Sequence, residues 1–286
     1  MPNRRAARTR AEVAIRRAFG GKRRRRKRVP RQIYPKGVER EYARALLRIV
    51  RQAQDQLKPL LEELPSMVEA AAHDRTVLDS ARLDAGEGRR IYELIEIARE
   101  SLRRAMSVGA LDALSREFAQ KVETWQRIQM GKQVRSVLGV DVFAGDPGLA
   151  AASEAFTASN VSLIRNLPQR MYDEIETLVQ EQVRVGALHK DIAKQIQDRF
   201  GIAERRAKLI ARDQVGKYYG AVQEQRQKAL GVERFIWRTS NDERVRPEHA
   251  AREGVEYSWG NPPEGGPGQP VNCRCYAEPV LDDLVG

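Results

Sequence analysis

Four residues near the C-terminal end carry side chains from which proteins build metal sites. Asp242 and His249 stand seven positions apart in the stretch WRTSNDERVRPEH, and Cys273 and Cys275 follow within the next 26 positions. Carboxylate, imidazole and thiolate groups all ligate zinc. On a strand, cysteines at positions i and i+2 point to the same face. We therefore expect the two thiols to meet the imidazole of His249, with Asp242 as a fourth candidate ligand.

The chemistry of this set has three interpretations. Zinc bound by all four residues would be structural, whereas a centre with a free position would hold a water molecule. Zinc sites use C-x2-C spacing more often than the C-x-C found here, so a packing and hydrogen-bonding role without metal stays open, as does redox chemistry of the cysteine pair. We expect either no cofactor or one structural zinc. Catalysis would need a carboxylate near this set to act as a general base, and apart from Asp242 only Glu243 and Glu248 of the same loop are close in sequence. We therefore expect no catalytic residues.

The segment that carries these residues has the pattern of a small sheet. The stretches ERFIWRT, GVEYSW and CRCYAEPV are rich in aromatic and β-branched residues, which predicts three strands. Residues 260–272, before the last of them, contain four prolines and four glycines and predict a loop. A module this small has little core. We expect Asp242, Arg246 and His249 to lie against the two cysteines and to hold the loop in place. Arg246 has two alternative roles, which are binding a phosphate and forming an ion pair with Asp242.

Upstream of this module the apolar residues recur at helical spacing. The stretches 38–65 and 88–106 place them at steps of three and four, and Pro59 should bend the first stretch. These stripes exceed the needs of one short bundle, so we expect Leu46 and Leu57 to bury against a partner. Residues 142–148 predict a loop. Further helices are expected at about 111–128, 150–165, 168–185, 188–199 and 204–231.

Aromatic residues of the last helix and of the sheet have expected places in the fold. We predict that Trp237 and Trp259 belong to the core rather than to a base-stacking surface. Of the neighbouring Tyr218 and Tyr219, one ring should cover the sheet and the other should meet solvent.

Basic residues are concentrated at the N-terminus. The formal net charge is +12, and residues 1–31 alone hold twelve arginines and two lysines against Glu12. Such a cationic block is typical of a protein with a polyanionic partner, most simply nucleic acid, and a solubilising tail is the alternative. We expect an arm that is disordered until it meets phosphates or a protein surface. The predicted DNA-binding residues are Arg4, Arg5, Arg8, Arg10, Arg16, Arg17, Lys22, Arg23, Arg24, Arg25, Arg26, Lys27, Arg28 and Arg31.

Length and composition exclude several classes of protein. The chain has 286 residues, 41% of them hydrophobic and 31% charged, which suffices for a buried core. It has no apolar run near the roughly 20 residues that span a bilayer, and its N-terminus has no apolar signal segment. Two cysteines this close in sequence do not frame a fold by a disulfide. We expect a soluble protein of a reducing compartment with no membrane partner.

The C-terminal half of the chain resembles a known family. The run IARDQVGKYYGAVQEQRQKALGVERFIWRTSNDERVRPEHAAREGVEYSW, the Gly/Pro-rich loop and NCRCYAEPV are similar to the Mu F-like minor head proteins of tailed bacteriophages, over roughly residues 155–283. The family usually has Thr and Glu where this chain has Asp213 and Gln214. The residues that match the family motif are Trp237, Thr239, Asp242, Val245, Arg246, His249, Gly254, Cys273, Arg274 and Cys275.

The resemblance implies a minor capsid protein that acts in head morphogenesis. Its implied partners are the phage portal protein and double-stranded DNA, with the major capsid or scaffold protein as a further candidate. It would be assembled in the bacterial host cytoplasm and lie in the virion, inside the head near the portal. An alternative is a metal-dependent hydrolase or toxin-like effector on a head-protein scaffold.

The predicted fold class is mainly α, with long helices, a small C-terminal α+β module and a disordered basic N-terminal arm. The expected division follows chain order. It comprises the basic arm 1–35, an N-terminal helical region 36–148, the helical part of the Mu F-like domain 149–231, and the α+β module with the C-R-C motif 232–286.

Overall fold

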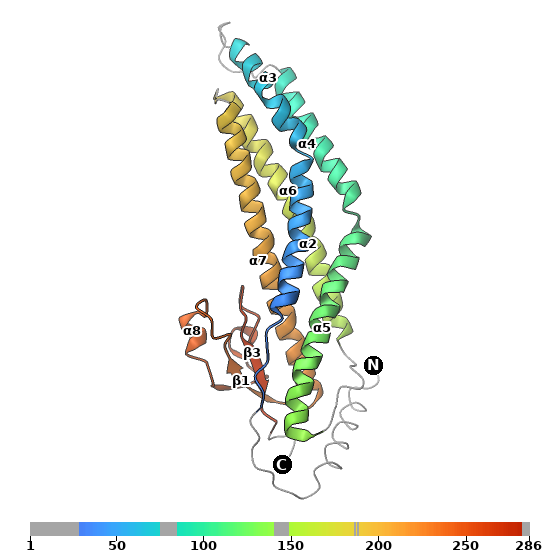
Figure 1. Cartoon of the computed structure of the whole chain (residues 1–286), viewed down its shortest axis with the longest axis vertical. Helices are drawn as coiled ribbons and strands as arrows, with labels where there is room; N and C mark the ends of the chain where they lie inside the picture. The colour runs from blue at the N-terminus through green and yellow to red at the C-terminus, as the bar shows by residue number, and fades with distance from the viewer. Residues whose placement is uncertain (1–28, 75–84, 140–148, 186, 188, 282–286) are drawn as a thin grey trace, which may run out of the picture. The chain divides into compact units, whose positions relative to one another are not determined.

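The computed structural model describes residues 29–74, 85–139, 149–185, 187 and 189–281. In these ranges the chain is mainly helical, and a small three-stranded sheet follows the last long helix (Figure 1). The predicted fold class is thereby confirmed. The disorder expected of residues 1–28 and the loop predicted at 142–148 lie outside the described residues.

Long helices form most of the described chain. Within it, no helix combines the length and the apolarity that crossing a membrane requires. The helices are α2 (Lys36–Asp55), α3 (Lys58–Asp74), α4 (Ala85–Ala105), α5 (Val108–Leu138), α6 (Ala150–Arg184) and α7 (His189–Ala229).

Three predicted helix boundaries were wrong. The first helix does not bend at Pro59 but ends at Asp55, and Pro59 lies in the first turn of α3, where its missing N–H is not needed. The helices expected at 150–165 and 168–185 are one helix, α6, which continues through Pro168 because the neighbouring Leu167 and Met171 are buried. Those expected at 188–199 and 204–231 are also one helix, α7, which runs through Gly201.

The chain forms two compact units, each assembled from segments that are distant in sequence. In the described residues, unit 1 comprises 29–40, 115–139, 149–158 and 212–281, and unit 2 comprises 41–74, 85–114, 159–185, 187 and 189–211. The division predicted above follows chain order, and it stays a prediction.

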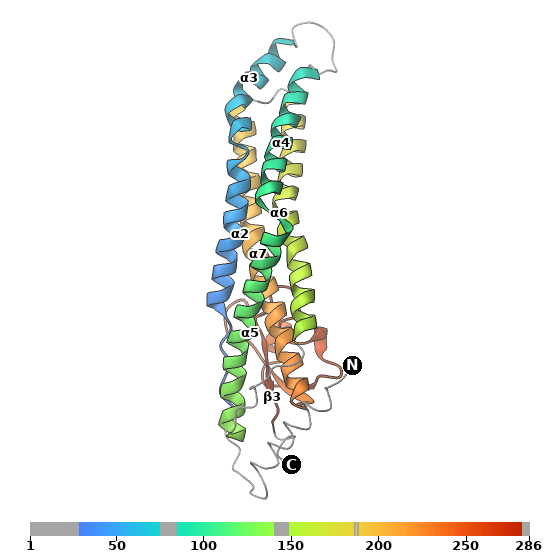
Figure 2. The ribbon, with the colours of Figure 1, turned by 90° about the vertical axis from the view of Figure 1, so that its right-hand side faces the viewer.

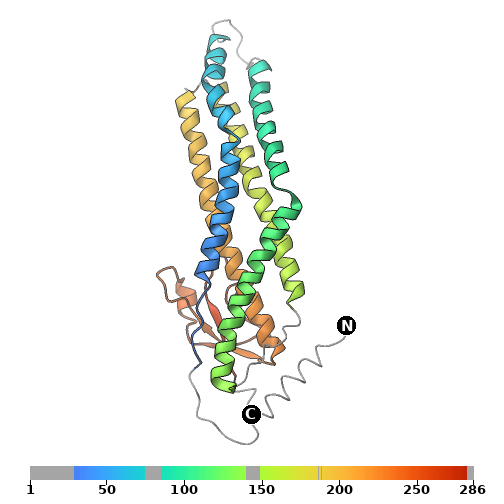
Figure 3. The same cartoon turned by 45° about the vertical axis from the view of Figure 1, so that its right-hand side comes forward.

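In unit 2, parts of α2, α4, α6 and α7 lie side by side (Figures 2 and 3). The Tyr42 hydroxyl on α2 donates to Asn160 Oδ1 on α6 at 2.6 Å. On α4, Arg99 forms an ion pair with Asp173 of α6 at 2.6 Å. Leu46 and Leu57 are fully buried in this unit. They belong to its core, so the expectation that they face a partner was wrong.

Unit 1 contains the sheet, whose strands are β1 (Arg234–Arg238), β2 (Glu256–Ser258) and β3 (Tyr276–Pro279). Their order is β2-β1-β3, and both pairings are antiparallel. All three strands coincide with predicted ones. Phe235 and Trp237 on β1 are fully buried, and Trp259 packs with them, so the predicted core role of both tryptophans is confirmed.

The extended segment 29–35 packs against α5 and α7, although we counted it with the arm. Gln32 donates to Gln133 Oε1 at 2.6 Å and accepts from the Tyr219 hydroxyl at 2.6 Å. The Trp125 indole donates to the carbonyl of Ile33 at 2.7 Å. A truncation that removes only the basic arm should therefore end at residue 28.

Helix α7 contacts the sheet module through residues that the sequence analysis did not single out. A Cβ at Gly216 would lie 2.5 Å from the Cys273 backbone oxygen, and one at Gly220 would lie 2.3 Å from that of Pro267, so both positions require glycine. The Gln227 side chain donates to the Ala277 carbonyl at 2.9 Å. Tyr218 and Tyr219 are both buried, so the expectation that one ring meets solvent was wrong.

Candidate metal centre

The structure brings His249, Cys273 and Cys275 together in unit 1. His249 Nδ1 lies 3.6 Å from Cys273 Sγ and 3.5 Å from Cys275 Sγ. The three ligand atoms all lie within 4.8 Å of one another, and all three residues are buried. The predicted approach of two thiols to one imidazole is present, although the cysteines precede β3 instead of lying on it.

The turn after β1 positions the imidazole. His249 belongs to the short helix α8 (Pro247–Ala250), which Pro247 begins with a φ angle suited to the first helical turn. Between β1 and α8, the Asp242 carboxylate accepts from the backbone N–H of Arg244 at 3.1 Å, which stabilises the turn. The His249 ring meets the buried Trp237 ring edge to face, with centroids 5.4 Å apart.

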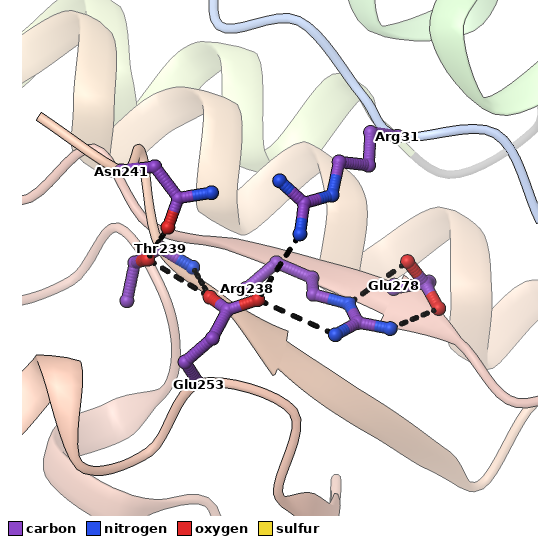
Figure 4. Close-up of polar contacts among 6 residues, drawn as sticks. All are labelled: Arg31, Arg238, Thr239, Asn241, Glu253 and Glu278. Carbon is purple, nitrogen blue, oxygen red and sulfur yellow. Dashed lines mark hydrogen bonds and ion pairs between the residues drawn. The ribbon is translucent and has the colours of Figure 1, made fainter.

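A polar network fixes the two ends of this turn (Figure 4). Arg238 on β1 donates to both carboxylate oxygens of Glu278 on β3 at 3.0 Å, and it lies 3.3 Å from Glu253. Glu253 accepts from the Thr239 N–H at 2.6 Å and from its hydroxyl at 2.8 Å. Burial would raise the pKa of Glu253, but these bonds from Thr239 and Arg238 lower it overall. The network consists of Arg31, Arg238, Thr239, Asn241, Glu253 and Glu278.

The loop that carries the cysteines is held from three sides. Arg246 donates to the Val271 carbonyl at 2.7 Å, and Asp213 of α7 accepts from the Asn272 N–H at 2.9 Å. Arg274 donates through two nitrogens to Glu39 of α2, at 2.6 and 3.2 Å. Asp213 thus has a structural role here, although the family usually has threonine at this position.

Glu264 orients the imidazole from the opposite side. Its Oε2 lies 3.1 Å from His249 Nε2, and its Oε1 accepts from Arg252 at 2.9 Å. The hydrogen bond from Arg252 contributes most, and together with that to His249 it lowers the pKa of Glu264 to about 2. Glu264 is therefore an ionised acceptor. Nε2 therefore carries the proton, and in the neutral imidazole Nδ1 presents its lone pair to the thiols.

Glu264 is a functional residue that sequence reasoning missed. It has a φ of 52°, which costs energy for a residue other than glycine, asparagine or aspartate. A signal was available, because Glu264 is the only charged residue in the Gly/Pro-rich stretch 260–272.

The pKa values of the two thiols are shifted in opposite directions. A hydrogen bond from Cys275 lowers the pKa of Cys273 to about 6 against the opposing effect of burial. The same hydrogen bond and burial raise the pKa of Cys275, while the Trp237 indole acts in the other direction.

The three residues line a pocket of about 180 Å³. Asp242 is the single carboxylate among the lining residues, and it lies 3.6 Å from the guanidinium of Arg274 rather than in the histidine–cysteine group. An ion pair of Asp242 with Arg246 was one of the two alternatives for Arg246; in the structure Asp242 pairs with Arg274, and Arg246 donates to the Val271 carbonyl. The lining comprises Arg212, Ser240, Asp242, Arg244, Val245, Arg246, His249, Asn272, Cys273, Arg274 and Cys275.

The family-motif residues are accounted for by contacts inside unit 1. Trp237 fills the core, and Gly254 has a φ of +78° and donates its N–H to the Trp237 carbonyl at 2.9 Å. Thr239 binds Glu253, and Arg274 binds Glu39. Of the predicted DNA-binding residues, Arg31 lies in the described residues, where it is 3.7 Å from Glu253. The other thirteen lie outside them.

Comparison with known proteins finds a family whose model matches part of the chain. Residues 173–278, from the middle of α6 to β3, match the family described as Phage Mu protein F like protein. This region is similar to that family. The suspected resemblance is confirmed over these residues, which include the histidine and both cysteines.

A relative of the chain is an uncharacterized protein of Haemophilus influenzae (strain ATCC 51907 / DSM 11121 / KW20 / Rd). The two are 33% identical over 171 residues, which is 58% of this chain and 38% of that protein. The chain thus spans well under half of the relative's length. No solved structure matches the chain.

Proposed function

We propose that this Mu F-like protein is a non-enzymatic minor head protein of a tailed bacteriophage, bound to the portal inside the head and in contact with DNA through its basic arm. The observation that carries the proposal is the Mu F-like region over residues 173–278. A structural role agrees with the internal contacts of the motif residues. It also agrees with the pocket lining, whose one carboxylate forms an ion pair with Arg274 and is poorly suited to act as a base.

The charge distribution supports contact with DNA. Residues 1–28 hold thirteen arginines and lysines against Glu12. The remaining residues have no net charge, because the whole chain has a net charge of +12. Cations next to packaged DNA would neutralise phosphates and release counterions.

Exposed apolar side chains of unit 2 support contact with the portal. Ile97 on α4 and Val108 at the start of α5 are 62% and 61% exposed. Val108 also borders a cavity of about 440 Å³ in unit 2, lined by residues of α4 and α6 and by the start of α5. Exposed apolar side chains such as these are candidates for a protein contact. We assign the portal contact to Ile97 and Val108 in place of Leu46 and Leu57.

Co-expression with the portal protein of the same phage tests the proposal. The wild-type chain should be retained on tagged portal, and the double variant Ile97→Asp, Val108→Asp should be lost while it stays folded by circular dichroism. Leu209→Asp is the matched control, because Leu209 is an exposed apolar residue of the same unit on α7, and it should be retained. No retention of the wild-type chain would refute portal binding. Retention of the folded double variant would place the contact elsewhere.

A further inference from the structure

We infer that His249 Nδ1, Cys273 Sγ and Cys275 Sγ bind one zinc ion, and that the fourth position of this ion is taken by a solvent oxygen in the adjoining pocket and not by Asp242. This inference is independent of the proposed head function. It goes beyond the four-residue set suggested by the sequence.

The distances between the ligand atoms match those of a tetrahedral zinc centre. With Zn–S of about 2.3 Å and Zn–N of about 2.0–2.1 Å, the sulfur and nitrogen ligands of one tetrahedral ion lie about 3.5 Å apart. The two distances from His249 Nδ1 to sulfur are 3.6 and 3.5 Å. Hydrogen bonding alone explains them less well, because one imidazole lone pair cannot accept well from two thiols at once.

The atoms around the ligands are also arranged as in metal centres. Glu264 binds the Nε2 proton of His249, which leaves Nδ1 free to ligate, and carboxylate–histidine–zinc arrangements of this kind fix the ligating tautomer. The Cys275 backbone N–H donates to Cys273 Sγ at 3.4 Å, which stabilises negative charge on this sulfur. Two thiolates and one imidazole are a ligand set that suits zinc.

Three of the five cysteine and histidine residues of the chain gather at this point. A metal here would join α8 to the segment before β3, across the Gly/Pro-rich loop. Because the sheet has three short strands, the module has little apolar core of its own. A bound ion would stabilise the folded module over the unfolded chain, as in other small metal-stapled modules.

The pocket determines the fourth ligand. Since all three ligating residues line the pocket of about 180 Å³, it has room for a water molecule beside the ion. Asp242 lines the same pocket, but its carboxylate pairs with Arg274 and also accepts from the Arg244 N–H. The four arginines of the lining, Arg212, Arg244, Arg246 and Arg274, favour a solvent ligand that carries negative charge.

X-ray absorption on the untagged full chain tests the inference. The protein is stripped with a chelator under reducing conditions, reloaded with zinc chloride and desalted. Elemental analysis should give about one zinc per chain, and the absorption fine structure should show two sulfur ligands at about 2.3 Å and two nitrogen or oxygen ligands at about 2.0–2.1 Å. Absence of zinc after reloading would overturn the inference, as would a first shell without sulfur.

Variants identify the ligands. His249→Ala, Cys273→Ser and Cys275→Ser should each lose the stoichiometric zinc, whereas Asp242→Asn should keep it with an unchanged first shell. Because a ligand variant can fail to fold, the absorption spectrum of the wild-type chain decides whether zinc is bound. Loss of zinc in a folded Asp242→Asn variant would show that the carboxylate closes the shell. A disulfide between the cysteines in the untreated protein, with no zinc bound, would favour the redox interpretation instead.

Discussion

Replacement of Gly220 by alanine should destabilise unit 1, although alanine is the better helix former. A Cβ at this position would lie 2.3 Å from the backbone oxygen of Pro267. Ordinary carbon–oxygen contacts begin at about 3.3 Å, so the helix and the loop would have to separate by roughly 1 Å. Overpacking of this kind costs about 1–3 kcal/mol, and the gain in helix propensity returns about 1 kcal/mol. We expect a net loss of up to about 2 kcal/mol in the free energy of unfolding.

Gly201→Ala in the same helix is the matched control. The nearest atom to its added Cβ is the flexible end of Arg205, at an ordinary distance of 3.5 Å. This variant should gain up to about 1 kcal/mol. Equilibrium urea unfolding of the full chain, followed by tryptophan fluorescence, measures both changes, because Trp237 and Trp259 lie in the sheet module. If Gly220→Ala stabilised the protein as much as Gly201→Ala, the close approach of α7 to the loop would be wrong.

Three further predictions concern the arm, the polar network and the metal. If about half of the fourteen predicted cations engage phosphates, log K for duplex DNA should fall with log salt at a slope of roughly −6. A chain starting at Val29 should bind duplex DNA far more weakly. A full-length variant with Arg23 to Arg26 changed to glutamine should have a salt slope shallower by up to about 3.6. Unchanged slopes would show that the arm does not bind the DNA. Glu253→Gln should lower the free energy of unfolding at neutral pH, where the wild-type carboxylate with its lowered pKa is ionised. This difference between variant and wild type should shrink as the pH falls from the ordinary glutamate pKa through the lowered one. A pH-independent difference in urea titrations would contradict the role of the charge. Removal of zinc by a chelator should lower the melting temperature of the wild-type chain but not that of a folded His249→Ala variant. Scanning calorimetry measures both. An equal decrease in the melting temperature of both proteins would point to an unrelated effect of the chelator.

The approach of His249 to the two cysteines could be predicted from the sequence. The strand pattern of 234–238, the turn residues after it and the proline before His249 all favour a chain that folds back onto the C-R-C segment. The amphipathic helices could also be recognised. Their boundaries could not, because buried neighbours override the local effect of Pro168.

Other features depend on which segments meet in space. Apolar spacing shows that Leu46 and Leu57 are buried, but it does not tell whether the same chain or a partner covers them. The carboxylate of Asp242 suits both a metal and an arginine, and the proximity of Arg274 decides between them. Gly216 and Gly220 are spaced by four in a long helix, yet the close approach that requires them is formed by the backbone of Cys273 and Pro267, which follow much later in the chain.

An asymmetric cryo-electron microscopy reconstruction of the portal vertex in intact particles of the encoding phage tests the central claim most directly. The account predicts helical density with a small sheet module inside the head, in contact with the portal through Ile97 and Val108. A resolved portal vertex without such density, in particles that contain the protein, would contradict it.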